Sequence, residues 1–81
     1  MKDFEVKIDE VYVPVKRRAS LDSDKVESLA ESIMEEGLQA PINLRHDGKR
    51  YVLVEGLHRL EACKALGEET ITAVLVQARQ H

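Results

Sequence analysis

Hydrophobic and polar residues follow two different periods along this chain of 81 residues. Apolar and charged residues alternate over 4–8, and a second apolar group over 11–13 precedes Pro14. An alternation with a period of two is typical of a strand with one buried face. The first part of the chain is therefore predicted to form one or two half-buried strands.

A helical period follows after a polar loop over 20–23. Apolar residues at i, i+3, i+4 and i+7 form one stripe on a helix, and here they are Val26, Leu29, Ala30 and Ile33. Asp24 is the expected N-cap of this helix, with Glu27 at the capping-box position three residues later. Gly37 is expected to end the helix as its C-terminal cap.

The second half of the chain alternates between strand and helix signals. An Asp47-Gly48 turn separates two short apolar segments, so residues 42–55 are predicted to form a β-hairpin. A second helix is expected from about Leu57 to Leu66, and a β-branched strand over 70–76. Together these elements predict an α+β fold, with a small mixed β-sheet and two principal helices.

Composition indicates a single small domain. Of its residues, 43% are hydrophobic and 33% are charged, as in ordinary soluble proteins, and the single cysteine excludes an intramolecular disulfide. No apolar run reaches the roughly 18 to 20 residues of a membrane span, so we expect a cytoplasmic protein without a membrane partner. We expect one domain over 1–81, with a core over 11–76 and a tail over 77–81. A net charge of -3 argues against nonspecific duplex binding, so DNA contact is expected only through another domain or chain.

The strand-to-helix junction at Gly56 is the first candidate binding site. An apolar strand over 51–55 turns at Gly56 directly into a basic helix start, Leu57-His58-Arg59. The first amides of a helix lack intrahelical acceptors and lie at the positive end of the helix dipole, so such a junction can bind a phosphate. Gly56 has no Cβ and lets a ligand approach the backbone. The alternative interpretation is a tight turn followed by two solvated basic residues.

The segment 37–43, between the first helix and the hairpin, is the second candidate. Its residue types suit a purely structural role, as a glycine cap, a rigid loop at Pro41 and a strand entry. Gln39 and Asn43 nevertheless carry amide donors and carbonyl acceptors, which can read the edge of a nucleobase beside a phosphate site. On the residues alone, both interpretations stay open.

The remaining polar groups carry weaker signals. The basic run over 16–18 is typical of a solvated loop that could also contact phosphate. Glu36 and Glu55 are the acids nearest the proposed pocket, and either could act as a base, so the catalytic residues stay undetermined. Cys63 has the position of a small core residue in a helix. The three histidines have no convincing metal-ligand spacing, and the sequence assigns no metal site.

The two candidate segments, in this order, resemble the ParB and sulfiredoxin superfamily. The resemblance extends over 11–76 and includes a Pro-containing first strand, the basic run and the helix over 25–33. The Gly-x-x-Gln-Pro-Ile loop of ParB N-terminal domains corresponds to Gln39-Ala40-Pro41-Ile42, with one extra residue. The Gly-Glu-Arg-Arg box of that family corresponds to Gly56-Leu57-His58-Arg59.

The resemblance implies a nucleotide-binding regulatory module in plasmid or chromosome partition or in transcription control. Its ligand would be CTP or ATP with Mg²⁺, with the phosphates at the helix start and the base near the preceding loop. A homodimer is left open. The residues that the resemblance assigns to the nucleotide are Gly56, Leu57, His58, Arg59, Gln39, Pro41, Ile42 and Asn43.

Two departures from the superfamily keep other functions open. The catalytic cysteine of sulfiredoxin falls on Leu57, so sulfinic acid reduction is not expected. ParB proteins continue beyond the last strand with a metal-binding segment and a helix-turn-helix, so this chain is either part of a longer protein or a free-standing pocket domain. The alternatives are a small phosphotransferase or a weak nucleotide hydrolase or nuclease, and a protein-interaction domain with a decayed pocket. The sequence has no carboxylate cluster that would position two ions for phosphodiester cleavage.

Overall fold

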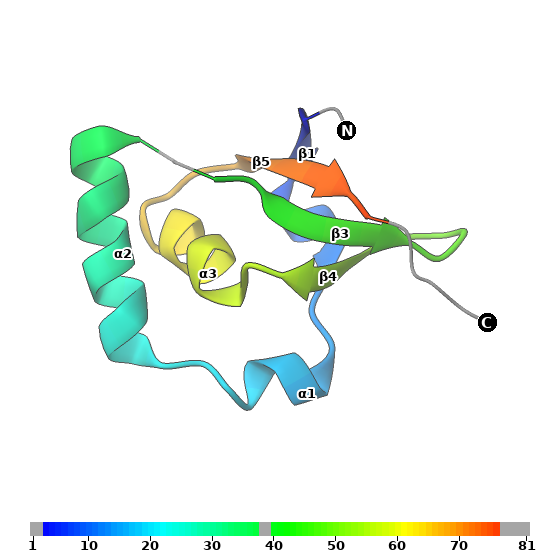
Figure 1. Cartoon of the computed structure of the whole chain (residues 1–81), viewed down its shortest axis with the longest axis horizontal. Helices are drawn as coiled ribbons and strands as arrows, with labels where there is room; N and C mark the ends of the chain where they lie inside the picture. The colour runs from blue at the N-terminus through cyan, green and yellow to red at the C-terminus, as the bar shows by residue number, and fades with distance from the viewer. Residues whose placement is uncertain (1–2, 38–39, 77–81) are drawn as a thin grey trace.

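The computed structural model describes residues 3–37 and 40–76 and confirms the predicted α+β class. Five strands form one sheet, with one helix packed against it and a longer helix outside that one (Figure 1). The elements, in chain order, are β1 (Asp3–Lys7), the 3-10 turn η1 (Ile8–Glu10), β2 (Val11–Tyr12), α1 (Val15–Arg18), α2 (Ser23–Glu36), β3 (Ile42–His46), β4 (Tyr51–Glu55), α3 (Leu57–Ala65) and β5 (Thr70–Leu75).

The sheet is mixed, as predicted, with the strand order β1-β5-β3-β4-β2. β3 and β4 form the predicted antiparallel hairpin, and β1 pairs antiparallel with β5. β3 pairs parallel with β5, and β2 pairs parallel with β4. Because β3 and β4 run in opposite directions, the start of β3 and the end of β4 lie side by side. Pro41, which directly precedes β3, and the start of α3 therefore lie at the same end of the sheet.

α3 is the helix that closes the hydrophobic core. Leu57, Leu60, Ala62 and Cys63 are its buried side chains. Leu57, Leu60 and Cys63 pack with buried residues of the sheet, among them Ile42 and Leu44 of β3, neither of which is exposed to solvent. Val6 and Ile8, from the first elements of the chain, belong to the same core. α3 lies between α2 and the sheet (Figure 1), so its start is held from both sides.

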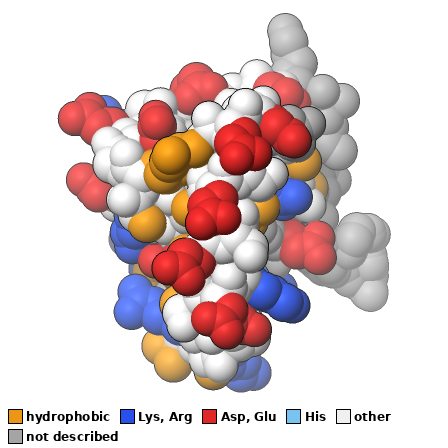
Figure 2. Space-filling view, turned by 90° about the vertical axis from the view of Figure 1, so that its left-hand side faces the viewer, with side chains coloured by type: hydrophobic (Ala, Val, Ile, Leu, Met, Phe, Trp, Pro, Cys, Tyr) orange, Lys and Arg blue, Asp and Glu red, His pale blue; other side chains and the backbone are white. Residues whose placement is uncertain are grey.

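α2 forms an outer layer against α3. Its predicted apolar stripe faces inward and is half-buried, and no residue of α2 is fully buried. Acidic side chains run along the solvent-facing side of this helix (Figure 2). The predicted cap at Asp24 is wrong by two residues: the side chain of Asp22 accepts hydrogen bonds from the N–H groups of Asp24 and Lys25. Gly37 ends the helix as expected and donates its N–H to the carbonyl of Ile33.

Two short helical segments had no signal in the hydrophobic pattern. η1 is a single 3-10 turn, and α1 places the basic run over 16–18 in one turn of helix instead of the expected loop. Pro14 is the N-cap of α1, and its carbonyl accepts hydrogen bonds from the N–H groups of Arg17 and Arg18. In residues 3–37 and 40–76, no helix has the length and apolar character that crossing a membrane requires.

Candidate functional site

The site is built around Gly56, where β4 passes into α3. Gly56 has a φ of 111°, in the range that favours glycine. A Cβ atom at this position would lie 2.7 Å from Cγ2 of Ile42, which is fully buried at the start of β3. The backbone of the turn therefore rests directly on the core, and only glycine fits this position without displacing Ile42.

The first turn of α3 offers unpaired backbone donors. Leu60 donates its N–H to the carbonyl of Gly56, which closes the first turn. The amides of residues 57–59 precede that bond and have no intrahelical acceptor. Within the described residues, no side chain caps them, and the first turn contains no acidic residue. These three N–H groups and the positive end of the helix dipole are free to bind an anion.

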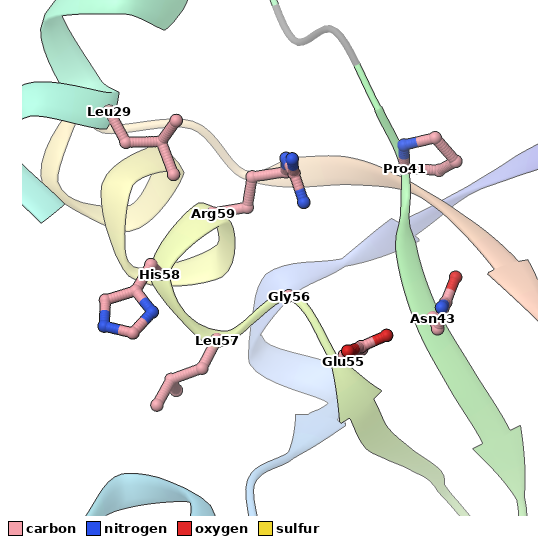
Figure 3. A pocket seen from close by; sticks show the side chains of 8 residues that line it. All are labelled: Leu29, Pro41, Asn43, Glu55, Gly56, Leu57, His58 and Arg59. Carbon is pink, nitrogen blue, oxygen red and sulfur yellow. The ribbon is translucent and has the colours of Figure 1, made fainter. Parts of the chain in front are cut away.

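A cavity of about 410 Å³ opens in front of this helix start (Figure 3). Its volume lies within the range of about 300 to 1,000 Å³ that is usual for small-molecule sites. Side chains and backbone from α2, β3, β4 and α3 surround it. The lining residues are Leu29, Pro41, Asn43, Glu55, Gly56, Leu57, His58 and Arg59.

Arg59 supplies positive charge to the cavity. It is half-buried and lies in the first turn of α3, beside the free amides. Its guanidinium extends toward Pro41 and away from His58 (Figure 3). In the part of the chain that the structure describes, Arg59 forms no ion pair that would neutralise it. A guanidinium in this position can bind a phosphate through two parallel hydrogen bonds.

His58 is held by the start of α2. The backbone N–H of Asp22 donates a hydrogen bond of 3.0 Å to Nε2 of His58, between residues 36 positions apart. An imidazole nitrogen that accepts a hydrogen bond carries no proton, so Nδ1 carries the proton in the neutral ring. His58 is thus tied to the start of α2 through Nε2 and lines the cavity beside Arg59.

A second hollow of about 450 Å³ adjoins the cavity along α2. Leu29 and His58 line both, so the two hollows are neighbours, and we refer to them together as the groove. The other lining residues are Asp24, Lys25, Ser28 and Ser32. Sequence reasoning missed this hollow. Its signal was the i, i+3, i+7 spacing of Lys25, Ser28 and Ser32, which places three polar side chains on one face beside the apolar stripe.

Most of the residues predicted to bind a nucleotide lie together. Pro41, Asn43 and the four residues 56–59 line the cavity, and among them Leu57 also belongs to the buried core. Ile42 lies beneath Gly56 and does not line the cavity. Gln39 lies outside the described residues.

The two acids predicted as candidate bases are separated in the structure. Glu55 lines the cavity, whereas Glu36 is the last residue of α2 and is not among the lining residues. In residues 3–37 and 40–76, no cluster of three or more His, Cys, Asp or Glu residues could hold a metal ion by itself.

Cys63 is not among the residues that line this cavity. It is 4% exposed and lines a different hollow, together with Glu68 and Ile33. Burial raises the pKa of its thiol, and the charge of Glu68 raises this pKa further, while the charge of Arg59 opposes both effects. A buried thiol with a raised pKa is a poor nucleophile.

Comparison with known proteins identifies relatives of this fold. The ParB N-terminal domain model matches residues 3–81. The probable chromosome-partitioning protein ParB of Helicobacter pylori is 39% identical over 77 residues, which cover 94% of this chain and 27% of that protein. The crystal structure of sulfiredoxin from Arabidopsis thaliana has a TM-score of 0.86 and 32% identity, covering 96% of this chain and 88% of that chain.

A second similar structure is a C-terminally truncated ParB from Caulobacter crescentus, solved in complex with CTP-γ-S. It has a TM-score of 0.81 and 24% identity, and the match covers 98% of this chain and 46% of that chain. This likeness concerns the fold. The chain also spans only 27% of the Helicobacter pylori ParB and 26% of the Campylobacter jejuni ParB that it matches.

Proposed function

Because the chain belongs to the ParB N-terminal domain family, we propose that it binds a nucleotide with the phosphates at the start of α3. One observation carries this proposal: the uncapped amides of residues 57–59 and the side chain of Arg59 face the same cavity. Backbone donors at a helix start and a guanidinium are complementary to a polyphosphate. The Caulobacter crescentus relative, which holds CTP-γ-S, supports the same ligand class.

The nucleoside would lie along one of two arms of the groove. The hollow on α2 offers Leu29 for contact with a base or sugar, and the hydroxyls of Ser28 and Ser32 for hydrogen bonds. The arm toward β3 offers Pro41 and the amide of Asn43, which is the position that the sequence suggested for the base. We favour the α2 arm, since it adjoins the phosphate site through His58. The ligand would be CTP or ATP.

The wider role that we propose is regulatory. Nucleotide binding would control plasmid or chromosome partition, or transcription, through another domain or a partner chain that contacts DNA. A homodimer is compatible with such a role. Reduction of a sulfinic acid is not part of the proposal, because Leu57 has no thiol and Cys63 lies outside the cavity.

Thermal stability in the presence of CTP, ATP, GTP and UTP tests the proposal. A ligand that binds only the folded state raises the melting temperature by linkage. We expect CTP or ATP to do so, and Arg59→Ala to weaken binding by about tenfold or more, since a hydrogen bond to a charged group contributes about 1.5 to 3 kcal/mol. Lys49→Ala is the matched control, because it removes one positive charge from the exposed hairpin turn.

Amide chemical shifts locate the ligand. In a titration of the ¹⁵N-labelled protein, the amides of residues 57–59 should shift first. Shifts over 25–32 would place the nucleoside in the α2 arm, and shifts over 41–43 would place it beside β3. If no nucleotide at millimolar concentration stabilises the protein or shifts residues 57–59, the proposal is wrong and the decayed-pocket alternative stands.

A further inference from the structure

The hairpin contains a β-bulge at the edge of the cavity. Leu44 pairs with Leu53, but the preceding residue Asn43 pairs with Glu55, so Val54 is an extra residue in β4. In a regular antiparallel ladder Asn43 would face Val54, and Glu55 would point to the opposite side of the sheet. The bulge turns Glu55 to the same side as Asn43, and both line the cavity.

Glu55 brings a negative charge into a cavity that otherwise suits phosphates. Its side chain extends toward β3 and Asn43 (Figure 3). Within the described residues, Glu55 forms no hydrogen bond or ion pair through its carboxylate. A carboxylate beside a bound polyphosphate would repel it, unless a cation lies between the two anions. The placement of Glu55 therefore predicts that a cation binds between this carboxylate and the phosphates.

We propose that the Glu55 carboxylate and the Asn43 side-chain oxygen bind the divalent cation carried by the nucleotide. This inference rests on the proposed nucleotide site. Opposite residues in an antiparallel pair have Cβ atoms about 4.5 to 5.5 Å apart, which lets two side-chain oxygens reach one ion. Mg²⁺ is usually held by one or two carboxylates together with substrate phosphates and water, not by a complete protein cage.

The donor set fits such an ion and explains why it would need the nucleotide. Carboxylate and amide oxygens are hard ligands, as Mg²⁺ and Mn²⁺ prefer. Two protein oxygens are too few to hold the ion alone, in agreement with the lack of a three-residue metal cluster in residues 3–37 and 40–76. Metal and nucleotide should therefore bind cooperatively, each raising the affinity for the other by the same factor.

Calorimetric titration of CTP and ATP, with Mg²⁺ and with EDTA, tests this inference on the whole chain. In the wild type, Mg²⁺ should raise nucleotide affinity by at least about fivefold, the lower end of ordinary coupling between two sites. Glu55→Gln should abolish this gain and leave the affinity in EDTA equal or higher, because it removes the repelling charge. Asn43→Ala should reduce the gain. Glu31→Gln, a similar change on the exposed side of α2, should have no effect.

Electron paramagnetic resonance of Mn²⁺ gives a second readout. Free Mn²⁺ should fall when wild-type protein is added to Mn²⁺ and a substoichiometric nucleotide, and fall less with Glu55→Gln. Equal metal dependence in wild type and Glu55→Gln would overturn the cation site while nucleotide binding stands. Absence of nucleotide binding by the wild type, with or without metal, would overturn both proposals. If Arg59→Ala loses nucleotide binding in EDTA and Glu55→Gln retains it, the phosphate contact is separate from the metal contact.

Discussion

Gly56 and Ile42 are packed so closely that a Cβ atom on Gly56 would lie 2.7 Å from Cγ2 of Ile42. Gly56→Ala should therefore lower the free energy of unfolding by about 2 kcal/mol or more, since the unfavourable backbone conformation costs about 1 to 3 kcal/mol and overpacking about 1 to 3 kcal/mol. Urea denaturation measures this loss. Because Ile42 is fully buried, it cannot move into solvent to relieve the contact.

Gly48→Ala separates the two contributions to that loss. Gly48 has a φ of 95° in the hairpin turn, and a Cβ there would meet no atom within 4 Å. In this variant the free energy of unfolding should fall only by the cost of the backbone conformation. The variant should therefore remain more stable than Gly56→Ala. Equal losses in the two variants would show that contact with Ile42 contributes nothing.

His58 and Asp22 link the start of α3 to the start of α2. His58→Ala removes the acceptor of the Asp22 N–H and should destabilise the protein by about 0.5 to 1.5 kcal/mol, the usual net contribution of a hydrogen bond. His58→Gln places a side-chain oxygen near the position of Nε2 and should retain most of the stability. Thermal unfolding of the three proteins measures the difference. A Gln variant as unstable as the Ala variant would argue against this hydrogen bond.

The regular elements could be predicted because their signals are local. The stripe on α2 has a helical period, and the Asp47-Gly48 turn indicates the hairpin between two apolar segments. α1 could not be predicted, because its four residues contain no helical period. The cap of α2 was placed at Asp24 because Asp22 and Asp24 are both suitable cap residues, and only the backbone distinguishes them.

The site was predicted where it depends on neighbouring residues and missed where it depends on distant ones. The Gly56 junction is a continuous segment with a recognisable strand, turn and basic helix start. The bond between Asp22 and His58 joins residues 36 positions apart, and no spacing in the sequence predicts it. The bulge at Val54 was hidden, since three consecutive apolar residues, 52–54, mask the alternation that would reveal an extra residue.

Cys63 should react slowly with alkylating reagents while the protein is folded. It is 4% exposed, and burial followed by the charge of Glu68 raises the pKa of its thiol, so little thiolate is present. Alkylation by iodoacetamide near pH 8, followed by mass spectrometry, should be much slower in buffer than in urea. Equal rates would contradict the buried position. A thiol whose pKa is raised in the folded state stabilises that state below its ordinary pKa of 9.0, and this contribution is lost at higher pH.

The Asp47 carboxylate should make the hairpin sensitive to acid. It accepts hydrogen bonds from the backbone N–H groups of Lys49 and Arg50, each 3.1 Å, and from Nε of Arg50 at 3.2 Å. The backbone bonds are the main reason that its pKa lies below the ordinary value of 3.8, and the Arg50 side chain adds to them. A carboxylate with a lowered pKa stabilises the folded state above its ordinary pKa, and this contribution is lost as the pH falls below it.

Asp47→Asn should therefore be less stable than wild type at neutral pH, with a difference that shrinks below about pH 3.8 in urea titrations. Glu31→Gln, on the exposed side of α2, is the control for removing one surface carboxylate. A pH-independent difference between Asp47→Asn and wild type would rule out ionisation of Asp47 as its cause.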